Sequence, residues 1–588
     1  MQNIYIGCEF YKEMIDKNCY YVDKTMLIND IVVKGSKVNL FTRPRRFGKT
    51  MALTTLKAFF EAEIDYKGNP VDNRHCFEGK KIMGAGEEVL SMLGRYPVLF
   101  VTLKPAKMDD FEGSFYQLKS LIQDEVARHS YLLSSDALSE DEKARFNEMY
   151  KSNRKPYYTD DDGGKRMRED ISLFSKAFGE LSLLLKKHHG KDVIILIDEY
   201  DVPLENAYFK GYYDRMVGFI RSFFENSLKT NTALQFAAVT GCLRISKESI
   251  FTGMNNLDVC SVRTRNFAEY FGFTPEETMK MLSDYELTER AEEVKEWYDG
   301  YLFGDTEVYN PWSVTKYVKE HIPADERVNV LPEPYWSNTS SNSIVKDLVY
   351  GASMTVRTEL DRLVQGGTIE KMIHEDITYA DIENRSDGKK SEENLWNFLF
   401  YTGYLKKVSE RQEGNKVFLT MCIPNAEVKY IYETRIYDWF NERVRSKTDR
   451  SALYKAILDR DCAGIEQFVN ELLRQAISTF DSQEAFYHGF FLSLLYDMPD
   501  YETQSNREEG IGRPDIRMLP LSPKDPAILF EVKARKKFPE MEDGINEAFE
   551  QIRNRKYIEG IIDDGFIGAV AFGICFCRKS CMVRLLEQ

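Results

Sequence analysis

Asn39-Leu-Phe-Thr-Arg-Pro-Arg-Arg-Phe-Gly-Lys-Thr50 reads as a short apolar strand, a tight basic loop and the beginning of a helix. A phosphate-binding loop requires that order, because backbone N–H groups at a helix N-terminus point at anionic oxygens. The lysine of such a loop adds a positive charge, and the hydroxyl that follows it can bind Mg²⁺. The stretch therefore predicts a nucleotide site formed by Arg46, Phe47, Gly48, Lys49 and Thr50, with Thr50 as a metal ligand.

One position departs from the generic pattern G-x-x-x-x-G-K-[ST], which would place a glycine at Arg43. An accidental Gly-Lys-Thr in a basic turn is the alternative interpretation of the loop. The following segment favours a true nucleotide site, because its apolar residues are spaced to bury one face of a helix. These residues are Met51, Leu53, Leu56, Phe59 and Phe60.

A second predicted strand, Asp192–Asp201, is an apolar run that ends in acidic residues suited to the same site. Asp198, at the carboxyl end of the strand, can hold Mg²⁺, and Glu199 can polarise the attacking water. A further predicted strand ends at Thr240, with Arg244 just beyond it. These two residues either contact the γ-phosphate or are a strand-end cap and a surface arginine. The pairing of loop and acidic strand predicts binding and hydrolysis of ATP with Mg²⁺.

Length and composition set limits on the rest of the chain. Its 588 residues suffice for roughly three or four domains, and 43% apolar with 29% charged residues is typical of a globular protein. No apolar run approaches roughly 18 residues and no leader peptide opens the sequence, so we expect a cytoplasmic protein without a membrane span. The ten cysteines include no C-x-x-C pair, and Cys575, Cys577 and Cys581 are expected to be buried thiols rather than zinc ligands.

The formal net charge of −15 argues against nucleic-acid binding by bulk charge, although local basic patches matter more. Three such patches lie beside predicted catalytic elements, and they favour a nucleic acid, preferably DNA, as partner. They are Arg43/Arg45/Arg46, Lys533/Arg535/Lys536/Lys537 and Arg553/Arg555/Lys556.

From about residue 451 the chain reads as a separate domain with its own chemistry. Two extended segments, 510–519 and 527–533, form a predicted hairpin that carries Asp515, Glu531 and Lys533. Paired carboxylates can hold Mg²⁺, which activates water and stabilises a phosphate under attack, while a lysine orients the nucleophile. Asp515 and Glu531 are therefore predicted metal ligands and, with Lys533, catalytic residues of phosphodiester hydrolysis.

The register of this hairpin can be predicted from the position of its turn. A turn centred near Lys524 places Asp515 opposite Lys533 and Arg517 opposite Glu531. Because side chains on a strand alternate between faces with period two, the two carboxylates and Lys533 then share one face.

Other polar residues near the hairpin are open to two interpretations. Gln551 and Arg555 lie four apart on a predicted helix that begins near Asp543, so both can face the site. Glu484, on a preceding helix, is either an additional acid of the site or a surface glutamate. His488 lies on an apolar helix and is expected to be a hydrogen-bonded core histidine rather than a catalytic base.

Several stretches resemble the AAA-ATPase-like family of bacterial proteins, in which arginine is usual at position 43. They are Tyr21-Val-Asp-Lys-Thr25, the loop 43–50, Ile197-Asp-Glu-Tyr-Asp201, Thr240–Phe251, Trp297–Tyr301 and Tyr309–Ser313. That family commonly carries a C-terminal PD-(D/E)XK nuclease-like domain, which Pro514-Asp515 and Glu531-Val-Lys533 resemble. Tyr487-His-Gly489 and 505–510 are similar to the version of that domain attached to the ATPase-like family.

The expected fold class is α/β, in three parts. These are an AAA-like P-loop ATPase with a parallel sheet over 1–275, a helical or winged-helix lid and connector over 276–445, and a restriction-endonuclease-like domain over 451–588. The expected function is ATP hydrolysis coupled to a Mg²⁺-dependent nuclease. The alternative is a nucleotide-driven regulatory switch whose nuclease fold only binds nucleic acid or a protein.

A third interpretation, a defence or mobile-element effector, differs in biology more than in chemistry. The sequence leaves open whether the chain forms a homo-oligomer. Arg263 and Arg265 are the residues that we consider for an arginine finger.

Overall fold

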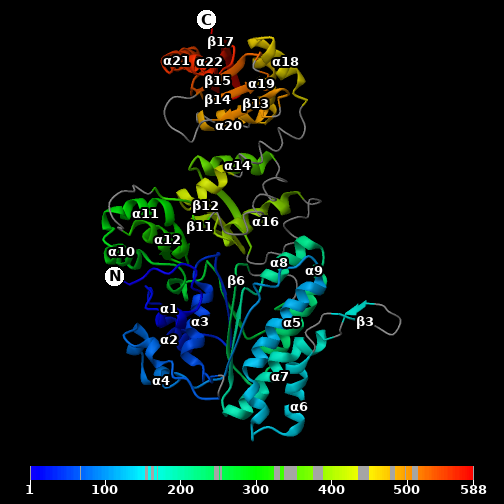
Figure 1. The fold of residues 1–588 in the computed structure, drawn as a ribbon. Coiled ribbons are helices and arrows are strands. Elements are labelled where there is room, and N and C mark those ends of the chain that lie inside the picture. Colours follow the sequence, from blue (N-terminus) through cyan, green and yellow to red (C-terminus); the bar gives the residue numbers. More distant parts are fainter. Residues whose placement is uncertain are drawn as a thin grey trace. The chain divides into compact units, whose positions relative to one another are not determined.

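The computed structural model describes most of the chain in two compact units (Figure 1). The described residues are 2–65, 68–152, 157–159, 165–167, 170–243, 250–251, 254–322, 331–336, 354–374, 388–434, 449–476, 484–496, 498–505, 514–522, 524–563 and 565–586. The first unit comprises Met1–Ser340 and Gly366–Lys429, and the second comprises Ser341–Gln365 and Tyr430–Gln588. No helix among the described residues is long and apolar enough to cross a membrane.

A five-stranded parallel sheet in the order β2-β5-β6-β1-β7 forms the centre of the first unit, as predicted. The strands are β1 (Val38–Thr42), β2 (Val98–Thr102), β5 (Val193–Asp198), β6 (Leu234–Gly241) and β7 (Leu257–Cys260). β1 and β5 are buried along their whole length, because helices cover both faces of a parallel sheet. Since β6 lies between β1 and β5, the carboxyl ends of these three strands meet at one edge.

Helices flank this sheet on both sides, with α3 on one side and α5, α7 and α9 on the other (Figure 1). The described part of the segment 105–190 is mostly helical, although β3 (Tyr157–Thr159) and β4 (Lys165–Met167) form an antiparallel pair within it. The helices are α1 (Tyr11–Asp16), α2 (Met26–Lys34), α3 (Lys49–Phe60), α4 (Glu87–Leu90), α5 (Phe111–Arg128), α6 (Glu140–Lys151), α7 (Ile171–His189), α8 (Val202–Lys210) and α9 (Tyr213–Phe224).

The remainder of the first unit combines short helices with a three-stranded antiparallel sheet in the order β10-β12-β11. Buried tyrosines such as Tyr285, Tyr298 and Tyr317 form much of its core. The elements are α10 (Pro275–Asp284), α11 (Ala291–Tyr298), β8 (Tyr301–Phe303), β9 (Thr306–Val308), α12 (Pro311–His321), β10 (Ile369–Ile373), α16 (Gly388–Tyr401), β11 (Lys406–Glu413) and β12 (Lys416–Cys422).

The second unit contains a mixed five-stranded sheet in the order β13-β14-β15-β16-β17, in which β15 and β16 are parallel. Cys575, Cys577 and Cys581 lie buried on β16 and β17, as expected. The elements are α14 (Met354–Val364), α18 (Ser451–Leu458), α19 (Cys462–Ala476), α20 (Glu484–Leu495), β13 (Tyr501–Ser505), β14 (Ile516–Pro520), β15 (Ala527–Ala534), α21 (Met541–Asn554), α22 (Tyr557–Asp563), β16 (Ala569–Cys577) and β17 (Ser580–Leu585).

The predicted register between β14 and β15 was wrong by two residues. Ile516 pairs with Phe530, so the turn is centred one residue earlier than Lys524 and Asp515 lies beside Glu531 rather than opposite Lys533. Because the shift is even, every side chain stays on its predicted face. The observed register therefore brings the carboxylates of Asp515 and Glu531 closer together than predicted, and both stay on the same face as Lys533.

Candidate functional site

The loop between β1 and α3 turns sharply at two positions. Among the described residues 43–48, Arg46 has φ +70° and Gly48 has φ +81°. Gly48 directly precedes α3, and its left-handed conformation is one that glycine adopts without steric cost. Successive backbone N–H groups in such turns, together with a helix N-terminus, form a concave surface for anions.

Lys49 and Thr50 connect this loop to the acidic end of β5. Lys49 Nζ donates to the carbonyl oxygens of Arg43 and Pro44, both at 3.1 Å, and lies 3.5 Å from Glu199 Oε1. Thr50 Oγ1 donates to Asp198 Oδ2 at 2.9 Å. The structure thus brings together the two halves of the site that the sequence predicted.

Asp198 is buried and accepts hydrogen bonds from three threonine hydroxyls. Besides Thr50, these are Thr240 Oγ1 at 2.6 Å from Oδ1 and Thr102 Oγ1 at 3.3 Å from Oδ2. Burial and the adjacent Glu199 raise the pKa of Asp198. Three hydroxyl groups from β2, α3 and the end of β6 therefore hold this carboxylate in one orientation.

Lys49 and Glu199 carry opposite charges in a buried setting. Burial disfavours the charge on Lys49, but the surrounding acidic groups, first Cys242 and then Glu199, raise its pKa overall. Burial also disfavours the charge on Glu199, yet Lys49 and Arg45 lower the pKa of this carboxyl overall. Both groups are therefore charged at neutral pH.

Thr240 lies where the sequence predicted, at the end of β6, and its hydroxyl is bound within the protein. Its Oγ1 donates to Asp198 and accepts from the backbone N–H of Glu199 at 3.3 Å. This placement orients the acidic end of β5. Arg244, the residue predicted beside it, lies outside the described residues.

The loop after β6 is anchored by two residues that sequence reasoning did not single out as site residues. Asp201 Oδ2 accepts from the backbone N–H groups of Cys242 and Leu243 at 2.8 and 3.0 Å. Tyr200 Oη donates to the carbonyl of Leu243 at 2.7 Å. A Cβ at Gly241 would lie only 2.6 Å from the ring of Tyr200, so this glycine lets the two strand ends approach. The sequence feature that could have identified Tyr200 and Asp201 was their position directly after the acidic pair Asp198 and Glu199.

Arg43, which replaces the expected glycine, turns into the protein rather than toward a ligand. Its side chain is fully buried, with Nη1 donating to the carbonyls of Thr42 and Cys260 at 2.9 and 2.6 Å. The guanidinium lies 5.0 and 5.1 Å from the ring centroids of Phe271 and Phe303. Because the Arg43 side chain lies on the inner side of the loop, it does not occupy the outer side, where a ligand would bind.

Two other predicted ligand-binding residues of the loop contact 301–312. The Phe47 ring is buried against Tyr301, with centroids 4.8 Å apart, so any contact of Phe47 with a ligand would come from its backbone. The Arg46 guanidinium lies 4.1 Å from the ring centroid of Trp312. The loop therefore packs directly against β8 and the first turn of α12.

A cavity of about 300 Å³ adjoins the loop. Lys49, Thr50 and Glu199 line it together with Lys104 and Lys107. Its apolar lining includes Tyr20, Tyr21, Phe273, Met281 and Trp312. A charged floor with aromatic walls is suited to a ligand that has a phosphate chain and a flat ring.

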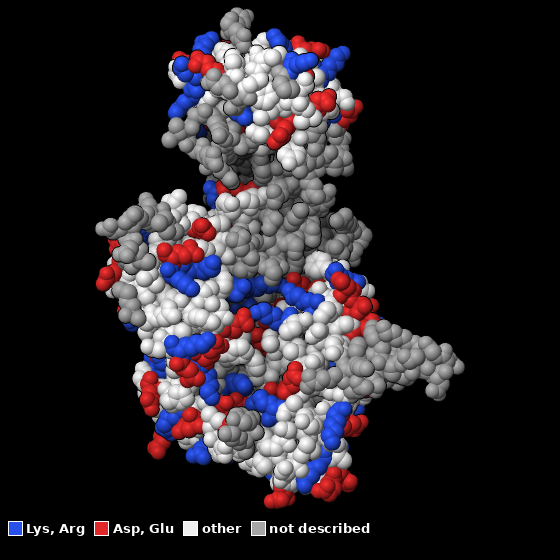
Figure 2. Space-filling model, in the orientation of Figure 1, with Lys and Arg blue, Asp and Glu red and all other residues white. Residues whose placement is uncertain are grey.

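Charges of both signs are mixed on the face of the first unit that Figure 2 shows. Lysine and arginine side chains lie among aspartates and glutamates rather than forming one uninterrupted basic surface. On the described part of this face, the distribution does not provide the broad positive field of a nucleic-acid coat.

In the second unit, the three predicted catalytic residues lie together. Asp515 Oδ2 accepts from the backbone N–H of Val532 at 2.8 Å, and Glu531 Oε2 accepts from the backbone N–H of Asp515 at 3.4 Å. Lys533 Nζ donates to Glu531 Oε1 at 3.2 Å and to Gln551 Oε1 at 2.9 Å. One lysine and two carboxylates thus meet at the amino end of β14 and the middle of β15.

Electrostatics at this second site favour a bound cation. Burial, followed by the charge of Asp515, raises the pKa of Glu531 to about 7. Although burial opposes it, Glu531 and the other carboxylates raise the pKa of Lys533. The side-chain oxygens of Asp515 and Glu531 are hard ligands of the kind that Mg²⁺ prefers, so this donor set fits the metal.

Of the neighbouring predicted residues, Gln551 and Glu484 lie near Lys533, and Arg555 lies just beyond the end of α21. Gln551, on α21, contacts Lys533 as expected, but α21 ends at Asn554, and the exposed Arg555 follows the helix. Glu484 Oε1 lies 3.9 Å from Lys533 Nζ with a half-exposed side chain, so it is close enough for a long ion pair.

His488 is buried on α20, and its Nε2 lies 2.9 Å from the carbonyl oxygen of Asp515. The expectation of a hydrogen-bonded core histidine is therefore confirmed. The contact also reaches the backbone of a predicted catalytic residue, so His488 helps to position the amino end of β14.

The first unit has the sheet and loop of a P-loop ATPase-like protein, and the second has the mixed sheet of a nuclease-like domain. Residues 5–251 match the family model for a predicted AAA-ATPase, and residues 482–585 match the model for the PD-(D/E)XK nuclease superfamily. The chain therefore combines an AAA-ATPase-like domain with a PD-(D/E)XK nuclease-superfamily domain, which confirms both resemblances.

Individual proteins are similar to this chain as well. A protein of Azotobacter chroococcum mcd 1, described as an uncharacterized protein in the vnfD 5' region, is 23% identical over 484 residues, which are 81% of this chain and 78% of that protein. The Walker-type ATPase PABY2304 of Pyrococcus abyssi aligns with 70% of this chain and 94% of its own, at 13% identity and a TM-score of 0.32.

Proposed function

We propose that this protein hydrolyses ATP and couples it to a Mg²⁺-dependent nuclease activity on nucleic acid, with DNA as the favoured substrate. The observation that supports the ATPase half best is the convergence of Lys49, Thr50, Asp198 and Glu199 beside the phosphate-binding loop. The nuclease half rests on the buried group of Asp515, Glu531 and Lys533. A cytoplasmic, bacterial setting is part of the same proposal.

In the ATPase half, the loop N–H groups and Lys49 would bind the β- and γ-phosphates of ATP. In the structure, Lys49 is held by two loop carbonyls and by Glu199. Transfer of Lys49 to a phosphate oxygen releases Glu199, which can then accept the proton of the attacking water. Thr50 Oγ1 and Asp198 would hold Mg²⁺, which neutralises charge on the phosphates when it is bound.

In the nuclease half, Asp515 and Glu531 would hold Mg²⁺, which supplies an activated water and stabilises charge on the scissile phosphate. Lys533 would donate a hydrogen bond to the attacking water and orient it in line with the departing oxygen. Gln551 fixes Lys533 from the opposite side through the 2.9 Å contact with its Nζ. Glu531 must be deprotonated to bind a metal, so metal binding releases a proton near neutral pH.

The domain boundaries belong to this proposal as well. We assign 1–275 to the ATPase, 276–445 to a lid and connector, and 451–588 to the nuclease. Phe47 packs on Tyr301 and Arg46 packs on Trp312, and these contacts support the assignment of a lid. A change in the loop on nucleotide binding would be transmitted through them to residues 301–312.

The same packing favours the second candidate, a regulatory switch. In that case nucleotide binding repositions 301–312 and changes what the second unit binds, while the nuclease fold performs no cleavage. The two candidates differ in one observable, which is metal-dependent cutting of nucleic acid.

The test is incubation of the purified protein with labelled single- and double-stranded DNA and RNA, with and without Mg²⁺ and ATP. Lys533→Ala is the test variant for cleavage, and Lys455→Ala, an exposed lysine on α18 of the same unit and outside the basic patches, is its matched control. Lys49→Ala tests ATP turnover against Lys57→Ala on the same helix. We expect Mg²⁺-dependent cleavage that is lost in Lys533→Ala and kept in Lys455→Ala. ATP turnover without cleavage of any substrate would support the switch instead.

A further inference from the structure

Asp16, His75 and Cys76 bring three kinds of metal-ligating atom together outside the residues that line the nucleotide cavity. Asp16 is the last residue of α1, and the other two lie on the 3₁₀ turn η1 (Arg74–Phe77). Their ligand atoms all lie within 4.8 Å of one another. His75 Nε2 is 3.1 Å from Asp16 Oδ1 and 3.3 Å from Cys76 Sγ.

These separations are close to those around a tetrahedral zinc ion. With zinc at about 2.0–2.1 Å from nitrogen and oxygen and about 2.3 Å from sulfur, neighbouring ligand atoms lie roughly 3.3–3.7 Å apart. The side chains of His75 and Asp16 are 52% and 47% exposed, so a cation can enter from solvent and a water molecule can complete its coordination. The two distances from His75 Nε2 would need to change by only a few tenths of an ångström on binding.

The imidazole of His75 is oriented by a second contact. Its Nδ1 lies 3.2 Å from the carbonyl oxygen of Asp72, and a carbonyl can only accept, so Nδ1 carries the proton. Metal-binding histidines are commonly fixed in this way, by a carbonyl on the nitrogen that does not bind the metal. Nε2 is the nitrogen that faces Asp16 and Cys76.

A divalent cation among the three atoms would accept a lone pair from the imidazole nitrogen, from the carboxylate oxygen and from the sulfur together.

We propose that Asp16 Oδ1, His75 Nε2 and Cys76 Sγ form a zinc site with one open position. The combination of thiolate, imidazole and carboxylate suits zinc, whereas Mg²⁺ takes oxygen ligands. Binding converts the thiol of Cys76 to a thiolate, so one proton passes to solvent for each ion bound. No electron transfer is involved.

The site would connect α1 to η1, and both pack on α3, the helix that begins at Lys49. Tyr11 of α1 donates its Oη to the carbonyl of Cys76 at 2.7 Å and its backbone N–H to Thr54 Oγ1 of α3 at 3.1 Å. Met14, on the same helix as Asp16, lines the nucleotide cavity. Zinc would therefore stabilise one wall of that cavity without contacting the nucleotide.

The test is titration of the metal-free full-length protein with Co²⁺ and then with Zn²⁺. A thiolate-to-cobalt charge-transfer band that saturates at one ion per chain and is displaced by Zn²⁺ is the expected result. His75→Ala removes an exposed ligand with little risk to folding, and Cys76→Ser removes the source of the band. Loss of an outer-shell partner costs about 10–100-fold in metal affinity, so loss of His75 itself should weaken Zn²⁺ binding by at least about 100-fold.

Cys462→Ser and His374→Ala are matched controls, because they change a half-buried thiol and a partly exposed imidazole elsewhere. Both should keep the band and the zinc affinity of the parent protein. The proposal is overturned if no thiolate band forms, or if His75→Ala binds Zn²⁺ as tightly as the parent. In either case the contact between His75 and Asp16 is an ion pair only.

Discussion

Among single side chains, Asp198 shows how the proposed nucleotide site is organised. Thr50, Thr102 and Thr240 reach it from three different elements and satisfy both carboxylate oxygens. A carboxylate held in this way needs little reorganisation when a bound cation takes the place of one of these hydrogen bonds. The hydroxyl of Thr50 is the one that the proposed metal shell would also use.

Thr50 therefore offers a specific test of the proposed metal shell. Thr50→Val keeps the shape of the side chain but removes the hydroxyl, and we expect it to weaken binding of the Mg²⁺–ATP complex by roughly 10–100-fold. Thr50→Ser keeps the hydroxyl and should bind within a few-fold of the parent. Calorimetric titration with and without Mg²⁺ measures both. Equal affinities for the two variants would contradict a role for this hydroxyl.

Gly241 provides a test of the close approach between the ends of β5 and β6. A methyl group there would lie 2.6 Å from Tyr200 and 2.8 Å from Asp201 Oδ1, so Gly241→Ala should destabilise the first unit by about 1–3 kcal/mol. Gly218 on α9 has open space around its Cα, and Gly218→Ala should stabilise the helix by up to about 1 kcal/mol. Chemical denaturation should show changes in the free energy of unfolding of opposite sign for the two variants if the packing is as described.

Glu427 predicts a pH dependence of stability. Its buried carboxylate accepts from Ser313 Oγ at 2.9 Å and from the backbone N–H of Trp336 at 2.8 Å, and burial raises its pKa from 4.5 to about 8. Between these pH values the folded protein holds a proton that the unfolded chain has lost. The free energy of unfolding should therefore fall as the pH rises from about 4.5 to about 8.

Glu427→Gln keeps the acceptor oxygen and removes the ionisation, so this part of the pH dependence should disappear. Glu292→Gln, which changes an exposed glutamate, should leave it unchanged. Thermal unfolding of the three proteins across this pH range is the measurement. A parallel pH profile in Glu427→Gln would show that another group causes the slope.

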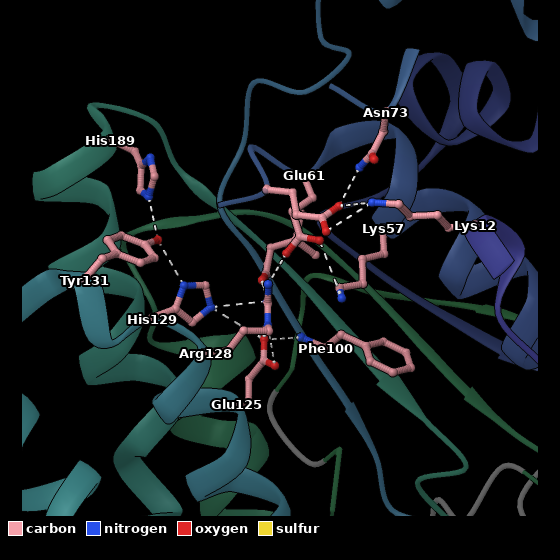
Figure 3. Close-up of polar contacts among 12 residues, drawn as sticks. Lys12, Lys57, Glu61, Asn73, Phe100, Glu125, Arg128, His129, Tyr131 and His189 are labelled. Carbon is pink, nitrogen blue, oxygen red and sulfur yellow. Dashed lines mark hydrogen bonds and ion pairs between the residues drawn. The ribbon is translucent and has the colours of Figure 1, made fainter. Parts of the chain in front are cut away.

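Among helices and strands, the edge strand β2 has a protective arrangement that Figure 3 shows in detail. Glu125 Oε1, on α5, accepts from the backbone N–H of Phe100 at 2.9 Å, and Arg128 Nη2 donates to the carbonyl of Val98 at 2.7 Å. Arg128 also bonds to Glu61 at the end of α3. Side chains thus satisfy edge groups that would otherwise pair with a foreign strand.

Glu125→Ala should be strongly destabilising, because it leaves the guanidinium of Arg128 and the N–H of Phe100 without this acceptor. Breaking a buried pair by removing one partner costs about 3–5 kcal/mol. Glu112→Ala, on the same helix, removes a more exposed pair with Arg215 and should cost less than about 1 kcal/mol. Equilibrium unfolding measures the difference, and light scattering reports aggregation through the uncovered strand. Similar losses in both variants would contradict the protective role.

The strands of the first sheet could be predicted because buried parallel strands are continuous apolar runs, as 193–198 shows. The β14–β15 register could not, because it depends on a turn whose sequence does not specify which residues pair. Asp198 and Glu199 were found because they end such an apolar run, whereas Tyr200 and Asp201, directly after them, were missed. Thr102 was missed as well, because an ordinary strand end carries no signal until the sheet order places it beside Asp198.

The same limit applies to contacts that span long stretches of sequence. Ser313 and Glu427 meet although 114 positions separate them, and neither lies in a recognisable pattern with the other. Gln551 was predicted to face Lys533 from helical spacing alone, since spacing is a local property. Arg555 was assigned to the same helix, but the helix ends one residue earlier.

For the complete chain, the division into two units predicts two unfolding transitions. A ligand that binds one folded unit stabilises it by about 2.7 kcal/mol at 100 times its dissociation constant. ADP with Mg²⁺ should therefore raise the midpoint of one transition in differential scanning calorimetry and leave the other in place. Lys49→Ala should abolish that shift. A single transition that moves as a whole would contradict independent unfolding of the units.

The buried Arg43 has a consequence for how proteins of this kind are found. Because the sharp turns of the loop fall at positions 46 and 48, the residue at position 43 is free to be a large inward side chain. A text search that insists on glycine there passes over this chain, although the part of the loop that faces a ligand is intact. A pattern that accepts arginine at position 43, and asks for aromatic residues at positions equivalent to Phe271 and Phe303, would recover similar proteins from genome collections.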